Sequence, residues 1–71
     1  MNTAQAVKKA RERRGLTRKQ LAQKAGLNIV TIYYIETGKT SPKMDTMLAI
    51  MRALDFDIVF NPKYKGGYHG E

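Results

Sequence analysis

The stretch RKQLAQKAGLNIVTIYYIET, residues 18–37, decides the fold of this 71-residue chain. It predicts two short helices that are separated by a turn at Gly26, where a positive φ angle costs no steric strain. Small and apolar residues recur at the spacing that two crossing helices need, and these are Leu21, Ala22, Ala25, Leu27, Ile32 and Ile35. In a unit of this kind the second helix can project from the body into a DNA major groove.

Further helices are expected on both sides of this unit. Thr3 is a suitable N-cap for a helix that ends near Arg14, because Gly15 follows as a typical stop. Ala6, Val7, Ala10 and Arg14 recur at helical spacing, and the first three give this helix a weak apolar stripe.

The other helices are predicted at residues 18–25, 29–36 and 44–54. Thr17 and Gln20 have the types and spacing of a capping box for the first of these. Asn28 is the N-cap candidate for the second, and Gly38 closes it. The buried side of the last helix is predicted to hold Met44, Met47, Leu48, Met51 and Leu54, with the methionines as core rather than as a binding stripe.

After Leu54 the period of the sequence changes from helical to alternating. Phe56, Ile58 and Phe60 alternate with Asp57 and Val59, and this spacing predicts a β-strand. A single strand needs a partner for its edge, and the same strand of a second copy, paired antiparallel, supplies one. In the alternative interpretation this segment is an extended tail that packs on the first and last helices.

These patterns divide the chain into three parts. We expect a helix-turn-helix domain at residues 1–55 and a dimerisation strand at residues 56–62, where Pro62 ends the ladder. Residues 63–71 are rich in glycine and polar residues, and we expect them to form a flexible tail.

Charge is distributed unevenly along the sequence. The net charge is +7, with a balance of +8 in residues 1–43 and of −1 in residues 44–71. A basic front half favours one face for a polyanion over a generic solubilising surface, which is the alternative.

Composition argues against several other classes of protein. The chain contains no cysteine, so it has neither disulfides nor thiolate metal sites. No apolar run approaches the roughly 20 residues of a membrane span, and the first residues lack the apolar core of a signal peptide. We therefore expect a cytoplasmic protein without a membrane partner, a metal or a cofactor.

No group of residues predicts catalysis. Gly38, Lys39 and Thr40 resemble the end of a phosphate-binding loop, but Tyr33 occupies the position of its first glycine. The only histidine, His69, lies in the expected tail. The chain is therefore not expected to be an enzyme or to have a small-molecule substrate.

Many residues along positions 5–56 match one known pattern, namely Arg11, Gly15, Leu16, Thr17, Leu21, Ala22, Ala25, Gly26, Leu27, Ile32, Ile35, Glu36, Gly38, Lys39, Pro42 and Leu54. With these residues the chain resembles the helix-turn-helix of the Cro/cI (lambda repressor-like, XRE) family. The resemblance implies an all-α, compact bundle of four or five helices in which residues 29–36 are the recognition helix. It also implies a buried, structural salt bridge between Arg11 and Glu36.

Members of that family usually have a fifth helix where this chain has DFDIVF, residues 55–60. In this feature the chain resembles HipB-type antitoxins, which are homodimeric repressors with a C-terminal strand and a toxin protein as a second partner. The expected function is therefore a homodimeric repressor that binds an inverted-repeat operator in double-stranded DNA and serves as the antitoxin of its operon. The alternatives are a phage-type or stand-alone regulator without a toxin, or a basic nucleic-acid-binding adaptor.

If Ile32 and Ile35 point inward, the period of the helix turns its opposite face outward. The expected base-contacting residues are Asn28, Ile29, Val30, Tyr33 and Tyr34. Packing on a partner is the alternative for the two tyrosines. The expected phosphate-contacting residues are Thr17, Arg18, Lys19, Thr31, Thr37, Lys39, Thr40 and Lys43, and the expected dimerisation residues are Phe56, Ile58 and Phe60.

Overall fold

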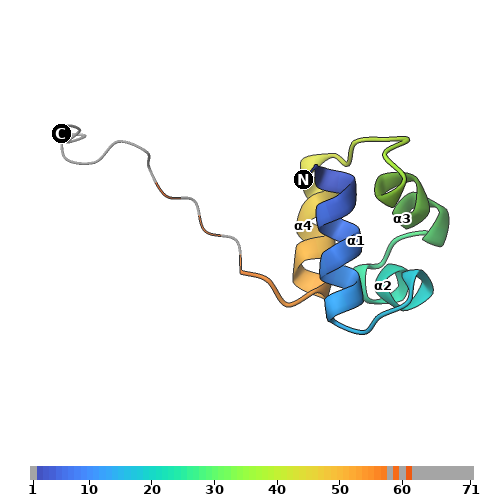
Figure 1. Cartoon of the computed structure of the whole chain (residues 1–71). Coiled ribbons are helices and arrows are strands. Elements are labelled where there is room, and N and C mark those ends of the chain that lie inside the picture. The colour runs from blue at the N-terminus through green and yellow to red at the C-terminus, as the bar shows by residue number, and fades with distance from the viewer. Residues whose placement is uncertain (1, 58, 60, 62–71) are drawn as a thin grey trace.

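The computed structural model describes residues 2–57, 59 and 61, and within them it contains four α-helices and no strand. The helices are α1 (Thr3–Arg13), α2 (Arg18–Ala25), α3 (Ile29–Glu36) and α4 (Met44–Ala53). α3 packs against both α1 and α2, and α4 packs against α2 (Figure 1). The predicted all-α class is confirmed, and the bounds of α2 and α3 are those expected from the sequence.

Side-chain caps begin α1, α2 and α3, whereas Lys43 at the start of α4 makes no such hydrogen bond. Thr17 and Gln20 form the predicted capping box of α2, and the Asn28 side chain accepts a hydrogen bond from the Val30 N–H at the start of α3. The predicted N-cap of α1 was wrong by one residue, because Asn2 rather than Thr3 caps the helix. Asn2 forms a second capping box with Gln5, a partner that Thr3 does not have at that spacing.

All four helices end in the same type of turn. In each, a residue with a positive φ angle lets the next N–H reach back to a carbonyl of the last helical turn, which satisfies groups that would otherwise lack partners. Gly15, Gly26 and Gly38 hold this position after α1, α2 and α3. After α4 the position is held by Asp55 at φ 63°, and the Phe56 N–H then donates to the Met51 carbonyl over 2.9 Å.

The hydrophobic core lies where the four helices meet. Ile32 and Ile35 of α3 are buried as predicted, and so is Leu21 of α2. The other buried apolar residues are Val7, Ala22, Ile50, Ala53 and Leu54. The helix-turn-helix therefore rests on α1, which packs against α3, and on α4, which packs against α2.

The predicted buried side of α4 needs correction. Ile50 is fully buried, although the sequence analysis left it out, whereas Met44 is 66% exposed. Met44 occupies the first turn of α4, beyond the core, and Met47 packs only partly against the core. The buried stripe therefore runs from Met47 through Ile50 to Leu54 at spacings of three and four residues.

The segment after α4 is described only in part. Phe56, Asp57, Val59 and Asn61 have no regular secondary structure, while Ile58, Phe60 and the predicted tail at residues 63–71 lie outside the described residues. The strand at residues 56–62 and its pairing with a second copy therefore stay predictions. None of the helices in the described part is long and apolar enough to cross a bilayer.

Candidate nucleic-acid interface

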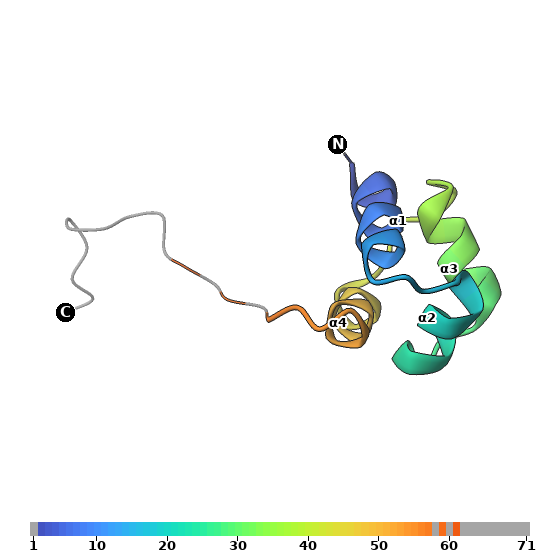
Figure 2. The same ribbon diagram turned by 60° about the horizontal axis from the view of Figure 1, so that its bottom comes forward.

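The outer face of α3 is exposed and contains large apolar side chains. Ile29, Val30 and Tyr33 are 45%, 49% and 47% exposed, whereas Ile32 and Ile35 of the same helix are buried. This is the orientation that the sequence predicted from the helical period. Figure 2 shows that α3 lies at the edge of the helical body, on the other side from α4. An exposed helix of this kind can enter a groove without rearrangement of the core.

Asn28 lies at the start of this face and has two functions to combine. Its Oδ1 atom accepts the Val30 N–H over 2.8 Å and thereby caps α3. Bidentate pairing with adenine needs both the oxygen and the nitrogen of the amide. Because the oxygen already serves the cap, the Nδ2 donor is the atom that Asn28 can best present to a base or a phosphate.

The N-terminus of α2 presents the next group of predicted residues. Thr17 caps the helix through its Oγ1 atom, and Lys19 is exposed. Backbone N–H groups and the partial positive charge of a helix start favour an anion at this position. Arg18, by contrast, is half-buried and does not point freely into solvent.

Arg18 belongs to an ion-pair network that joins three helices. Its Nε atom donates to Glu36 Oε1 over 3.0 Å, and its guanidinium lies 5.1 Å from the centroid of the Tyr33 ring. Glu36 also accepts two hydrogen bonds from Arg11, at 2.6 and 3.0 Å, while Arg11 Nη1 donates to the Leu16 carbonyl. The resemblance to Cro/cI proteins implied the Arg11–Glu36 pair, and the structure contains it.

Both buried members of this network are held in their charged forms. Burial alone would raise the pKa of Glu36, but hydrogen bonds from Arg11 and Arg18, with their positive charges, outweigh it and lower the pKa. The hydrogen bond to Glu36 raises the pKa of Arg11, although burial opposes this. Within the described part of the chain, no buried side-chain nitrogen or oxygen lacks a hydrogen-bond partner.

α2 and α3 cross at the turn formed by Gly26, and the outer face of α3 stays exposed above a small core. This is the geometry of a known family. The sequence pattern described as Helix-turn-helix matches residues 7–61. The chain belongs to the helix-turn-helix family. This assignment confirms the resemblance to the Cro/cI family that the sequence analysis stated. The fold of that family is the fold of a DNA-binding regulator and not that of an enzyme.

A curated relative supports the assignment. The uncharacterized HTH-type transcriptional regulator y4dL of Sinorhizobium fredii (strain NBRC 101917 / NGR234) is 34% identical over 59 residues. The match covers 83% of this chain but only 30% of that protein. The helix-turn-helix chain therefore spans about 30% of the length of the curated relative it matches.

Two solved structures are also similar to this chain. The restriction-modification controller protein C.AhdI from Aeromonas hydrophila has a TM-score of 0.75 and 25% identity, over 78% of this chain and 83% of its own. A tyrosine-to-alanine mutant of the restriction-modification controller protein C.Esp1396I has a TM-score of 0.75 and 27% identity, over 78% of this chain and 71% of its own.

Most of the remaining phosphate candidates lie around the C-terminal end of α3, where Thr37, Lys39, Thr40 and Lys43 are exposed. Thr31 lies in the first turn of α3 and is half-buried, as is the base-contact candidate Tyr34. The Thr37 hydroxyl donates to the Tyr33 carbonyl over 2.9 Å, so its hydrogen is used within α3. Lys39 Nζ lies 4.7 Å from the centroid of the Tyr34 ring, which places both side chains at one edge of the predicted interface.

Sequence reasoning missed the contact between Arg18 and Glu36. A cation at the start of a helix is unfavourable for the helix itself, and this signal indicated that Arg18 needs a negative partner. The sequence analysis assigned a phosphate to that role, whereas the nearest negative group is a carboxylate 18 residues further along the chain.

Proposed function

We propose that this helix-turn-helix chain is a sequence-specific transcriptional repressor that acts in the cytoplasm as a homodimer. The exposed apolar face of α3 is the observation that carries this proposal. Ile29 and Val30 are 45% and 49% exposed to solvent. Neighbouring exposed apolar side chains of this kind indicate a surface that a partner covers. Thymine methyl groups in the major groove can provide apolar contacts for these side chains.

In this proposal α3 reads bases and the surrounding residues bind phosphates. The base-contacting residues are Asn28, Ile29, Val30, Tyr33 and Tyr34. The phosphate-contacting residues are Thr17, Arg18, Lys19, Thr31, Thr37, Lys39, Thr40 and Lys43. In a homodimer two copies of α3 would enter major grooves about 34 Å apart, and the operator would be an inverted repeat. Phe56, Ile58 and Phe60 are the proposed dimerisation residues.

Two regulatory roles are open to such a repressor. The sequence DFDIVF after α4 favours an antitoxin that also binds a toxin protein. The similarity to C.AhdI and C.Esp1396I favours a second candidate, a controller that regulates the expression of a restriction-modification system. Both roles require DNA binding, and co-purification of the chain with a toxin from its host would favour the first.

Selection of bound sequences from random duplex DNA at one fixed salt concentration tests the DNA-binding proposal. We expect an inverted repeat to emerge. A single asymmetric site that is occupied by one monomer would contradict the dimer.

The same assay separates base reading from phosphate binding. Ile29→Ala should change the preferred base at one position of each half-site, because it removes the proposed apolar contact with a thymine methyl group. Lys19→Ala should weaken all sequences alike and reduce the slope of log affinity against log salt by about 0.9 for each phosphate that is no longer neutralised. Lys24→Ala, at the opposite end of α2, is the matched control and should leave both the slope and the preference unchanged.

A further inference from the structure

A second exposed surface lies on α1, and its sequence alternates small and basic residues. Residues 6, 9, 10, 13 and 14 fall at helical spacing and form one stripe, which consists of Ala6, Lys9, Ala10, Arg13 and Arg14. Together with Phe56 they line a hollow of about 480 Å³. Because alanine has only one methyl group, these two positions leave space that a larger side chain would fill. We call this surface, with its adjoining apolar floor, the α1–α4 groove.

The floor of the α1–α4 groove is apolar. An adjoining hollow of about 200 Å³ is lined by Val7 and Leu54 of the core edge, and also by Ala6, Ala10, Met47, Met51 and Phe56. None of these residues offers a polar side-chain atom. The groove can therefore accept apolar side chains, whose burial would remove exposed apolar surface from water.

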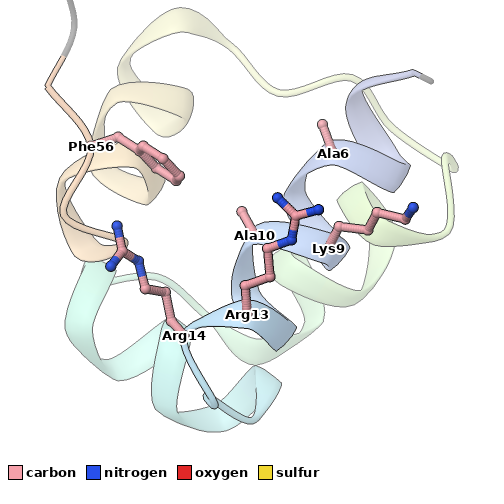
Figure 3. Close-up of a pocket in the computed structure, with 6 residues that line it drawn as sticks. All are labelled: Ala6, Lys9, Ala10, Arg13, Arg14 and Phe56. Atoms are coloured by element: carbon pink, nitrogen blue, oxygen red, sulfur yellow. The ribbon is translucent and has the colours of Figure 1, made fainter.

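The end of α4 positions the aromatic wall of the groove. The left-handed turn at Asp55 directs Phe56 back toward α1, and the Phe56 side chain is 40% exposed. The Arg14 guanidinium lies 5.2 Å from the centroid of the Phe56 ring. In Figure 3 Phe56 extends from the segment after α4 toward α1, which carries the Ala6, Lys9, Ala10 and Arg13 side chains across the hollow.

The rim of the groove is positive. Within residues 2–57, 59 and 61, no ion pair involves Lys9, Arg13 or Arg14. Asp55 and Asp57 flank Phe56, but neither lines the groove. An occupant with negative charges beside its apolar side chains would complement this rim.

The groove is separate from the predicted DNA-binding face. α3 packs on α1, and in both Figure 1 and Figure 2 α4 lies on the other side of the body from α3. A molecule in the α1–α4 groove would therefore not need to displace DNA from α3. The charge of the rim also disfavours a second copy as occupant, because a twofold axis would bring Lys9, Arg13 and Arg14 of the two copies together.

We propose that the α1–α4 groove binds an acidic amphipathic helix of another protein. Its apolar side chains would enter between Ala10, Met51 and Phe56, and its carboxylates would meet the cations of the rim. Helices with one apolar face commonly bind in grooves in this way, and the two alanines allow their close approach. The proposal stands independently of DNA binding by α3, because it uses a different face, and it shares only Phe56 with the proposed dimerisation residues.

A synthetic peptide of about 15 residues tests the proposal, since shorter helices are marginal in water. Leucines at positions i, i+3, i+4 and i+7 form its apolar face, and glutamates form the remainder. Titration of the full-length, isotope-labelled chain should shift the NMR signals of Ala6, Ala10 and Met51 but not those of α3. A twin peptide with lysines in place of the glutamates should bind at least about tenfold more weakly.

Matched charge reversals locate the binding site. The double variant Lys9→Glu with Arg13→Glu should lower the affinity for the acidic peptide at least about tenfold. The double variant Lys8→Glu with Arg52→Glu is the control, because it also reverses one lysine of α1 and one arginine in the last turn of a helix. Neither residue lines the groove, so binding of the peptide should be unchanged. Ala6→Trp, at an exposed position, should fill the groove and block binding, while circular dichroism verifies that each variant folds.

Several outcomes would overturn the proposal. Equal affinity for the acidic and the lysine peptide would show that the rim does not select the occupant. Groove signals that shift with protein concentration in the absence of peptide would assign the groove to a second copy. Displacement of the peptide by random duplex DNA would assign the rim to nucleic acid. Loss of operator binding with peptide binding intact would contradict only the proposed function.

Discussion

Glu36 connects the body of the molecule to the start of α2. Its two carboxylate oxygens accept hydrogen bonds from Arg11 and Arg18, so one buried acid fixes the positions of two cations. Arg18 in turn lies over the ring of Tyr33, a proposed base-contacting residue. The ion-pair network is therefore both a structural connection and a support of the predicted DNA-binding face.

Removal of Glu36 should be far more harmful than removal of another glutamate. Glu36→Ala leaves Arg11 buried without its carboxylate partner, which should cost about 3–5 kcal/mol of the free energy of unfolding. That is a large share of the roughly 5–15 kcal/mol typical of a domain. Urea denaturation measures the change, and Glu12→Ala, an exposed glutamate on α1, should change stability by less than about 0.5 kcal/mol. Similar losses for the two variants would contradict the structural role.

The lowered pKa of Glu36 predicts a loss of stability in acid. Because the folded-state pKa lies below the unfolded value of about 4.3, Glu36 stabilises the fold above that pH. This contribution disappears as the pH falls through the folded-state pKa. Arg18→Met removes one hydrogen bond to Glu36, so the acid-induced loss should begin at a higher pH. Thermal unfolding between about pH 2 and pH 6 measures the pH at which stability is lost, and Lys19→Met is the control that should leave this pH unchanged.

The four helices are specified mainly by their ends, and this is why much of the fold could be predicted. Capping residues and glycines indicated the bounds of α2 and α3 because both signals are local in sequence. The bounds of α1 and α4 were each wrong by one residue at the C-terminus. The stripe of α4 was predicted less well, because Met44 and Ile50 differ in burial through tertiary packing rather than through local spacing.

The site was predictable to a similar extent. The outward face of α3 follows from the helical period once Ile32 and Ile35 point inward, and the structure has them there. Both uses of Asn28 were predicted, since it was the N-cap candidate of α3 and a candidate for base contact, and the structure confirms the cap. The partners of Arg18 were not predictable, because they depend on the positions of atoms between helices, which periodicity does not specify.

Two substitutions of Asn28 should separate its cap from its contact with DNA. Asn28→Ser keeps an oxygen for the Val30 N–H but removes the amide donor, so the sequence preference should change while stability is retained. Asn28→Ala removes both and should lower the free energy of unfolding by about 1 kcal/mol as well. Thermal unfolding and duplex selection measure the two effects. An unchanged preference in both variants would exclude Asn28 from base contact.

The left-handed residue after α4 predicts a stabilising substitution. A side chain at φ 63° is strained, and glycine relieves that strain. Asp55→Gly should therefore raise the free energy of unfolding by up to about 1 kcal/mol, as judged by chemical denaturation. Asp57→Gly provides the comparison, because no such strain exists there, and it should not stabilise the chain. Equal effects at the two positions would count against the strain.

At the scale of the whole molecule, the proposed dimer makes a prediction about spacing. Two rigidly held copies of α3 bind together only if their half-sites face the same side of the duplex. Insertion of about five base pairs, half a helical turn, between the half-sites should abolish joint binding, and insertion of about ten should restore part of it. Footprinting on the three duplexes measures this, and joint binding at every spacing would contradict a rigid dimer.

The turn that ends α4 also has a consequence for how this body can be combined with other sequences. The N–H groups of Leu54, Asp55 and Phe56 bond to carbonyls of the last turn, so the helix is finished without help from residues further along. A chimera that exchanges everything beyond Asp57 for the oligomerisation module of an unrelated protein should therefore keep the same operator preference. The added module would determine only the number of copies that assemble and the distance between them on the duplex.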